Sequence, residues 1–289
     1  MKTRSNKPYS RKNSDKSKSE RTSGGRKKTS FDKPRKNYSK SKSVREEKDG
    51  GTYTIRLNKY LADAGICSRR EADVHIAGGA VTVNGKIVTQ LGTKVLPTDK
   101  IQFGGETLSR EKLRYFLLNK PKGFITTSKD PQDRKTVMNL VENACKERIY
   151  LVGRLDKNTV GLLMFTNDGE LAKKLTHPKH EIKKIYHVFL DKGISKGDLE
   201  KIANGLELED GLIKVDKVSW VLSENDKKQV GIELHSGRNR IVRRIFEHLG
   251  YEVVKLDRVY FAGLTKKDLQ RGKFRELSEK EVNLLKRLK

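Results

Sequence analysis

An aspartate near the middle of the chain has the surroundings that most favour chemistry. Asp156 follows Gly153-Arg154-Leu155 and precedes Leu162-Leu163-Met164-Phe165, an apolar run with the composition of a buried strand. A loop held on a rigid sheet suits a catalytic carboxylate, which can serve as an acid, a base or a nucleophile. From the residues alone, the favoured interpretation is plainer: the Asp156 side chain caps a turn, as Asp side chains often do.

Several other chemistries lack their sequence signatures. There is no GxGxxG or Walker loop, which argues against nucleotide binding, and there is no nucleophile elbow. Cys67 and Cys145 lie far apart without a CxxC motif, which excludes a disulfide scaffold and a cysteine-rich zinc site. His177 and His180 are three residues apart, but no third ligand accompanies them. We therefore expect both histidines to be surface or RNA-facing residues.

The elements around Asp156 alternate irregularly between strands and helices. Strands are expected at 115–118, 162–165, 185–190 and 230–234, because apolar residues cluster or alternate there. A helix is expected after Gly169 with a stop at Pro178, and an amphipathic helix over 239–249 closed by Gly250. This order lacks the repeat of a doubly wound parallel fold. It predicts an α+β domain over 113–289, with a mixed, mainly antiparallel sheet flanked by helices.

A smaller unit is expected over residues 54–105, followed by a linker at 106–112. Leu57 and Leu61 indicate a short helix, and Ser68 with Glu71 forms the capping box of a second one. Asn84-Gly85 then indicates the turn of a hairpin. Basic residues around the two helices suggest phosphate contacts, although a solvated helix surface would look the same. These residues are Arg56, Lys59, Arg69 and Arg70.

The charge of the chain points to a polyanionic partner. The 289 residues carry a net charge of +27, and residues 1–50 hold 18 Lys or Arg against 6 Asp or Glu, with no Leu or Ile. Such a segment cannot bury enough apolar surface to offset its ordering entropy, so we expect a disordered basic tail over 1–53. The tail either attracts RNA phosphates, keeps the protein soluble or acts as a localisation signal.

The chain also lacks the sequence signatures of membrane insertion and secretion. No apolar stretch reaches the length that spans a bilayer, and the N-terminus has no apolar core of a secretory signal. A cytoplasmic protein with no membrane partner is therefore expected.

Two segments resemble known families. Residues 54–105 resemble the S4-type RNA-binding module, through Arg56-Leu57-Asn58-Lys59-Tyr60-Leu61-Ala62, Ala64 to Ala72, and Val81 to Gly85. The segment from Gly153 to Gly169 resembles the catalytic motif of RNA pseudouridine synthases of the RsuA/RluB/RluF family. Asn119-Lys120-Pro121, Lys184 to Val188, and Gly237 to Arg244 resemble three further motifs of that family. The last has the form typical of the RluB-like branch.

The resemblance implies an enzyme that isomerises uridine to pseudouridine within RNA, without a cofactor or metal. It assigns Asp156 as the catalytic carboxylate, and Arg243 is the expected partner that orients it. An ordinary surface pair of Arg243 with Glu247 is the alternative. Tyr186 is expected to stack on the target base, or else to be a core tyrosine. RNA contacts are expected from Arg154, Arg238 and Arg240.

The RluB-like motif favours large-subunit (23S) ribosomal RNA as the substrate, or RNA within a pre-ribosomal particle. Three alternatives remain open from the sequence. The substrate could be small-subunit 16S rRNA, the enzyme could act on tRNA or broadly, or the protein could be a non-catalytic ribosome-assembly factor. We expect a monomer.

Overall fold

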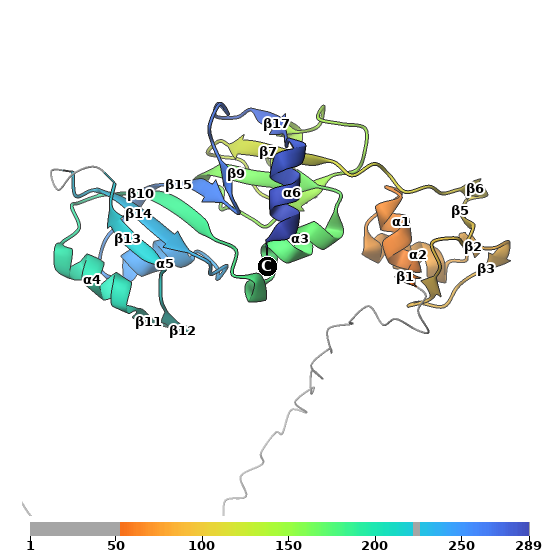
Figure 1. The fold of residues 1–289 in the computed structure, drawn as a ribbon, viewed down its shortest axis with the longest axis horizontal. Helices are drawn as coiled ribbons and strands as arrows, with labels where there is room; N and C mark the ends of the chain where they lie inside the picture. The colour runs from red at the N-terminus through yellow and green to blue at the C-terminus, as the bar shows by residue number, and fades with distance from the viewer. Residues whose placement is uncertain (1–52, 222–225, 289) are drawn as a thin grey trace, which may run out of the picture. The chain divides into compact units, whose positions relative to one another are not determined.

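The computed structural model describes residues 53–221 and 226–288, which form a small N-terminal unit and a larger domain (Figure 1). The predicted α+β class is confirmed, with the small unit first and the mixed sheet after it. The expected basic tail lies outside the described residues, apart from its last position.

The small unit contains two helices and short antiparallel strands. Helix α1 (Leu57–Asp63) is followed by α2 (Arg69–Ala77), and the predicted capping box of Ser68 and Glu71 is present at the start of α2. Asn84 and Gly85 both have positive φ, as a tight hairpin turn requires. The strands are β1 (Ile55–Arg56), β2 (Val81–Val83), β3 (Lys86–Ile87), β4 (Lys94–Val95), β5 (Ile101–Phe103) and β6 (Glu106–Thr107).

The boundary of this unit differs from the sequence expectation. Strand β6, assigned to the linker above, pairs with β5 at the edge of the sheet ordered β3-β2-β5-β6. Leu108 also packs against the buried cluster of the unit. The unit therefore extends to about residue 108, because the Gly104-Gly105 turn begins a last hairpin instead of ending the fold.

Nine strands of the described chain form the main sheet of the larger domain. Seven follow the order β13-β14-β10-β15-β9-β7-β17, with β16 beside β15 and β8 beside β9. The pairing of β15 with β9 is parallel, and the other pairings among these strands are antiparallel. The strands are β7 (Tyr115–Lys120), β8 (Tyr150–Val152), β9 (Thr159–Thr166), β10 (Lys184–Leu190), β13 (Lys217–Trp220), β14 (Gln229–Leu234), β15 (Val253–Phe261), β16 (Leu264–Thr265) and β17 (Phe274–Glu276).

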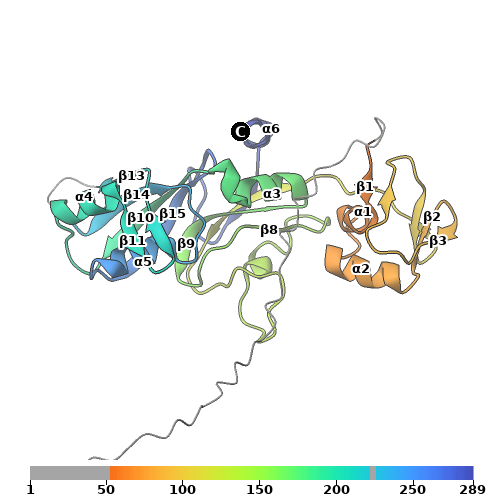
Figure 2. The same ribbon diagram turned by 90° about the horizontal axis from the view of Figure 1, so that it is seen from below.

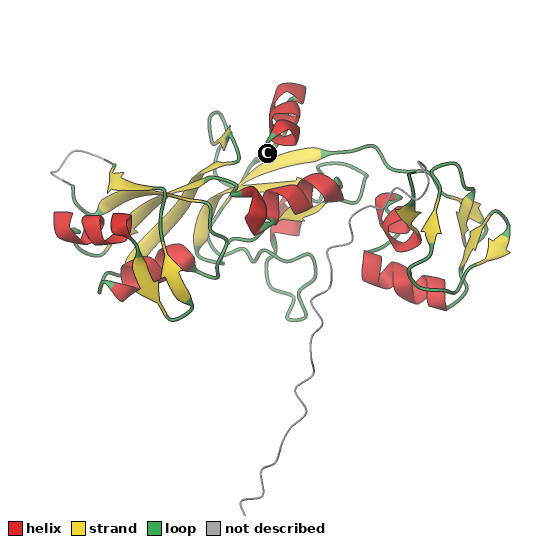
Figure 3. Cartoon of the chain, turned by 60° about the horizontal axis from the view of Figure 1, so that its bottom comes forward, coloured by secondary structure: helices red, strands yellow, loops and turns green. Residues whose placement is uncertain are grey.

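Strand β9 is buried along its whole length because both of its faces are covered. Leu162 and Met164 belong to a cluster with residues of α3 (Gly169–Thr176) and α6 (Glu279–Arg287). Leu163 and Phe165 belong to a second cluster, which includes Leu155 and the 3-10 helix η1 (Val137–Leu140). Figure 2 shows α3 and α6 on one side of these strands and the segment around η1 on the other, and Figure 3 shows the strands of the sheet in yellow with helices in red around them. Side chains alternate between the two faces, as strand geometry requires.

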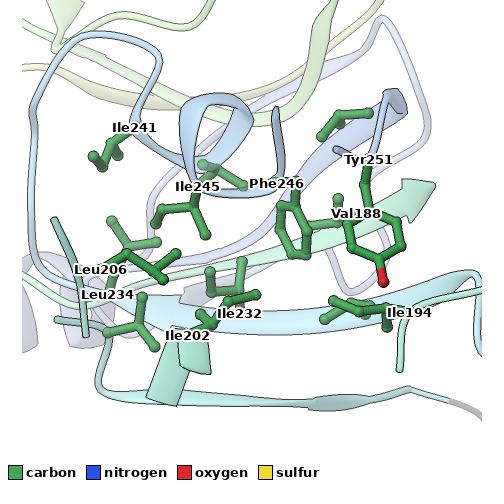
Figure 4. Packing of buried hydrophobic residues seen from close by; sticks show 14 of the residues in the cluster. Val188, Ile194, Ile202, Leu206, Ile232, Leu234, Ile241, Ile245, Phe246 and Tyr251 are labelled. Carbon is green, nitrogen blue, oxygen red and sulfur yellow. The ribbon is translucent and has the colours of Figure 1, made fainter. Parts of the chain in front are cut away.

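The other half of the sheet is covered by α4 (Lys196–Asn204) and α5 (Ile241–His248). Ile245 and Phe246 of α5 pack against Ile232 and other residues of that half (Figure 4). Helix α5 begins at Ile241, two residues later than predicted, because Arg240 adopts a left-handed conformation with φ of 46°. The remaining elements are the 3-10 helix η2 (Pro178–His180), and a hairpin of β11 (Leu206–Leu208) and β12 (Gly211–Ile213).

Candidate active site

Asp156 lies in the loop between β8 and β9, directly before the buried strand. Its side chain is 37% exposed, and its carboxylate accepts no hydrogen bond from any described residue. The turn is closed instead by the backbone, where the Thr159 amide donates to the Asp156 carbonyl at 3.0 Å. The turn-capping interpretation of Asp156 is therefore wrong, because the side chain takes no part in the turn.

The backbone of this loop is held by a buried ammonium group. Lys120, the last residue of β7, is fully buried, and its Nζ lies 2.8–3.2 Å from four carbonyl oxygens. Three of them belong to the loop and to the start of β9, at Asp156, Lys157 and Thr159. Burial lowers the pKa of Lys120 to about 8, while the Asp156 charge opposes that change.

A threonine fixes the loop from the side of the second cluster. The Thr126 hydroxyl donates to the Leu155 carbonyl at 2.6 Å and accepts from the Leu155 amide at 3.3 Å. The Leu155 side chain is buried. The residue before Asp156 is thus anchored by packing and by hydrogen bonds, which leaves Asp156 on a rigid support with an accessible carboxylate.

Two arginines lie beside the Asp156 carboxylate. Arg243 Nε and Arg240 Nη1 are each 3.8 Å from Asp156 Oδ2, longer than a hydrogen bond but close enough for charge attraction. Arg243 is buried and donates from Nη1 to the Val253 carbonyl at 2.8 Å. Burial and the neighbouring Arg240 lower the pKa of Arg243, and Asp156 acts in the opposite direction.

Arg243 does not form the surface ion pair with Glu247 that was the alternative from the sequence. Glu247 pairs with Arg240, at 3.2 Å, and α5 turns Arg243 toward the sheet instead of toward solvent. The left-handed Arg240 and the first turn of α5 together bring both guanidinium groups to one carboxylate.

Tyr186 is half-buried on β10 at the edge of the cavity beside Asp156. Its ring packs against both the α5 cluster and the cluster that contains Leu155. Its hydroxyl has no hydrogen-bond partner in the part of the chain that the structure describes. The two sequence interpretations therefore overlap, since the ring has packing contacts and also lines the cavity.

A cleft of about 620 Å³ brings Asp156 and Tyr186 together, and a second cleft of about 400 Å³ shares Asp156 and Arg240 with it. Arg243 lines the second cleft. The first is large enough for a nucleoside and has mixed polar and apolar walls, as small-molecule sites commonly do.

The remaining predicted RNA contacts lie at exposed positions, apart from the half-buried Lys59. Arg154 and Arg238 line the first cleft, and Arg238 also donates to the Gly211 carbonyl at 2.9 Å. In the small unit, Arg56 comes directly before α1 and Lys59 lies within α1, while α2 begins with the other two basic residues. Three of these four side chains are exposed and Lys59 is half-buried: Arg56, Lys59, Arg69 and Arg70.

The two histidines do not form a ligand set. His177 is exposed, and its Nδ1 accepts from the Lys179 amide at 3.2 Å. Within residues 53–221 and 226–288, no group of three or more His, Cys, Asp or Glu side chains is arranged to hold a metal ion.

Sequence reasoning missed three cations of this region: the buried Lys120 and Arg258, and the half-buried Lys184. Each had a detectable signal, because a lysine or arginine at an inward position of an apolar strand must find buried partners. Lys120 follows Tyr115-Phe116-Leu117-Leu118-Asn119. Lys184 lies on the same strand as Tyr186, and Arg258 lies on the neighbouring strand β15.

Comparisons with known proteins place these residues in a family. The RNA pseudouridylate synthase family matches residues 114–248, and the S4 domain family matches residues 55–101. Ribosomal large subunit pseudouridine synthase B of Bacillus subtilis (strain 168) is 47% identical over 237 residues, covering 81% of this chain and 96% of the relative. The protein of the same name from Pseudomonas aeruginosa is 37% identical over 237 residues, covering 80% of this chain and 61% of the relative.

A solved structure agrees with this assignment. A crystal structure described as a pseudouridylate synthase is 29% identical and superimposes with a TM-score of 0.57. The match covers 80% of this chain and 99% of the solved one.

Proposed function

Since the chain belongs to the RNA pseudouridine synthase family, we infer that it isomerises uridine in ribosomal RNA, with large-subunit rRNA as the preferred substrate. The observation that carries this inference is the accessible Asp156 carboxylate between Arg240 and Arg243, in a cleft that also contains Tyr186. The name of the Bacillus subtilis relative supports the choice of the large subunit.

The chemistry begins with a target uridine that leaves its helix and enters the cleft, at a cost of a few kcal/mol. The base lies against the ring of Tyr186, and stacking of this kind returns about 1–3 kcal/mol. Asp156, which lies beside two guanidinium groups, acts as a nucleophile or base on the uridine while the bond between C1′ and N1 breaks. The base then turns and is rejoined through C5.

The other basic groups serve to hold RNA. Arg154 and Arg238 lie at the rim of the cleft, where they can contact the phosphates that flank the target. The S4 domain binds a neighbouring part of the RNA through its exposed arginines. Two linked binding units raise each other's effective concentration on one RNA, so no second copy of the chain is required and we propose a monomer.

The place of action proposed here is the cytoplasm, where rRNA of a bacterial cell is made. Among the described residues, no helix is long and apolar enough to cross a bilayer.

The test is tritium release from [5-³H]uridine-labelled rRNA, with 23S and 16S transcripts assayed separately, both naked and in immature particles. We expect wild-type protein to release tritium from 23S rRNA. Release from 16S rRNA alone would move the substrate to the small subunit. No release from any of these RNAs would contradict the inferred reaction and favour a binding role in ribosome assembly.

Asp156→Asn should abolish this release while leaving RNA affinity nearly unchanged, because the amide keeps the shape but cannot act as a nucleophile or base. Filter binding and single-turnover release measure the two properties separately. Glu200→Gln, which neutralises an exposed carboxylate on α4, is the matched control and should behave as wild type. A large affinity loss in Asp156→Asn would instead give Asp156 a structural role.

A further inference from the structure

A buried guanidinium in the floor of the cleft has donors without acceptors. Arg258 lies on β15, directly opposite Tyr186 of β10 and Gly161 of β9, and is only 3% exposed. Its Nε donates to the Leu162 carbonyl at 2.9 Å, but no described residue accepts from its two other nitrogens. Nη2 is fully buried. Unsatisfied buried donors on a charged group are costly, so their retention calls for an explanation.

A second cation lies on the same face of the sheet. Lys184 is two residues before Tyr186, so both side chains point to one side of β10. Its Nζ donates to the Ile182 and His235 carbonyls, both at 2.7 Å. Burial, and then the charge of Arg258, lower the pKa of Lys184 to about 8. Asp216 opposes this change, but it hydrogen-bonds to His235 and forms no ion pair with Lys184 among the described residues.

Both cations line the cleft that contains Asp156 and Tyr186, and the walls around them are partly apolar. The Arg258 guanidinium lies over the ring of Phe261, with 4.6 Å from its carbon to the ring centre. Val152 and Leu256, both buried, also line this cleft. This part of the cleft offers apolar surfaces next to buried N–H donors. It therefore fits a planar heterocycle with carbonyl oxygens. A hydrated phosphodiester suits the exposed arginines at the rim better.

We propose that Arg258, supported by the charge of Lys184, binds a carbonyl oxygen of the extruded uracil and stabilises its negative charge while the base is detached. This role deepens the isomerisation proposed above and rests on it. Asp156 and Arg258 then divide the reaction between them, with the carboxylate serving the sugar and the guanidinium serving the base.

The charge balance of the step explains the need for a cation. When the bond between C1′ and N1 breaks, its electron pair goes to N1, and Asp156 either bonds to C1′ or takes the C2′ proton. The resulting uracil anion spreads its charge over N1, O2, C5 and O4. C5 then forms the new bond to C1′, while the Asp156–C1′ bond breaks or, on the other route, Asp156 returns the proton to C2′. C5 then loses its proton and N1 gains one. Donors fixed beforehand at a developing oxyanion lower the barrier without reorganising.

The experiment compares Arg258→Gln with wild type on two versions of one 23S rRNA transcript, made with uridine or with 5-fluorouridine. The rate is followed on both as loss of the N1-linked nucleoside in digested RNA, because C5 of 5-fluorouridine carries fluorine and has no proton to release. Fluorine withdraws electrons and stabilises the uracil anion, so a lost cation matters less on that RNA. We expect Arg258→Gln to lower the single-turnover rate on uridine RNA by about 10²–10³-fold, as removal of an oxyanion donor does. On fluorinated RNA, the loss should be at least about tenfold smaller, and RNA affinity should stay within about threefold.

Two further variants keep the comparison interpretable. Arg258→Lys retains a charge and should fall between wild type and Arg258→Gln. Arg275→Gln removes a partly buried arginine that pairs with Glu281 away from the cleft, so it should lower stability without any fluorine-dependent effect on rate. Both are measured with the full-length protein, with thermal unfolding recorded alongside the rates.

Three outcomes would overturn the proposal while wild-type conversion remains normal. A rate loss of equal size on both RNAs, with a lower melting temperature, would give Arg258 a structural role only. A matching loss of affinity with a reduced salt dependence would make it a phosphate contact. An unchanged rate would remove it from the reaction. If wild-type protein converts neither RNA, the proposed function itself fails.

Discussion

At the scale of single residues, Arg240 and Arg243 differ in solvent exposure although both lie 3.8 Å from Asp156. The Arg243 side chain is 10% exposed and the Arg240 side chain 45%. Water and salt screen the attraction of the exposed arginine, whereas the buried one acts through a medium of lower dielectric constant. The Arg243 hydrogen bond to Val253 also fixes its direction.

This difference predicts unequal effects of one substitution at the two positions. Arg243→Gln should lower the single-turnover rate by about 10²-fold, since misplacing a catalytic group costs that much. Arg240→Gln should cost no more than about fivefold, in line with exposed ion pairs. Single-turnover assays, with enzyme in saturating excess over RNA, measure the rates of both variants. Equal losses would mean that the exposed arginine orients Asp156 as strongly as the buried one.

At the scale of elements, the close approach of β9 to β15 depends on a glycine. Gly161 has φ of +107°, and a Cβ added there would lie 2.3 Å from the Arg258 carbonyl oxygen and 2.6 Å from the Arg258 amide nitrogen. Neither backbone atom can move without breaking the parallel pairing of the two strands. The same pairing brings Arg258 and Asp156 into one cleft.

Gly161→Ala should therefore destabilise the protein by several kcal/mol, through both the left-handed φ and the collision with the backbone, of which the φ strain alone costs about 1–3 kcal/mol. Gly197→Ala in α4 is the matched control, because its added Cβ meets only Ser195 Oγ at 3.9 Å. It should be neutral or stabilising by up to about 1 kcal/mol. Urea unfolding of both variants provides the measurement, and similar values for the two would refute the argument.

The lowered pKa of Lys120 predicts that turnover falls as the pH becomes alkaline, while the contribution of Lys120 to stability rises. A neutral amine can donate only two hydrogen bonds, so the hold on the Asp156 loop should weaken, and turnover fall, as pH rises through about 8. The folded pKa is below the ordinary 10.5, so the unfolded chain binds more protons between about pH 8 and 10.5. Over that window, the contribution of Lys120 to the free energy of unfolding should therefore rise with pH.

The stability part of this prediction is measured as the difference between wild type and Lys120→Met in urea unfolding at several pH values. Lys184 titrates in the same range, so the activity profile is repeated with Lys184→Met, in which the alkaline loss should persist. A difference between wild type and Lys120→Met that does not change with pH would show that Lys120 does not titrate there.

At the scale of the whole molecule, charge is distributed over more than the catalytic domain. Residues 1–50 carry a net charge of +12 out of +27. Neutralising RNA phosphates releases counterions, and each contact on a single strand adds about −0.7 to the slope of log affinity against log salt. Deleting residues 1–50 should therefore weaken binding of rRNA and flatten that slope, with turnover intact at low salt.

Filter binding over a series of salt concentrations tests this expectation. A variant in which the Lys and Arg residues of the segment are replaced by Gln separates charge from chain length and should match the deletion. An unchanged slope in both would leave the segment with a solubilising role.

The sequence by itself determined the elements and the family. Alternating and helical periodicities, the Ser68 capping box and the Asn84-Gly85 turn are local signals, and the structure has those elements at nearly the predicted bounds. The motif around Asp156 is continuous in the chain, so it could be recognised without a fold. Local signals were least reliable at the ends of elements and units. Helix α5 begins later than predicted because Arg240 is left-handed, and the small unit is longer than predicted because it includes β6.

Only the tertiary structure determines which charged side chains lie close together. Asp156, Tyr186, Arg243 and Arg258 come from separate elements, and only the strand order β10-β15-β9 with α5 beside it brings them to one place. Whether Glu247 pairs with Arg243 or Arg240 depends on a single left-handed residue. The sequence shows that Lys120 and Arg258 stand among apolar strand residues, but the carbonyl groups that accept their hydrogen bonds include ones from other elements, which only the fold brings close.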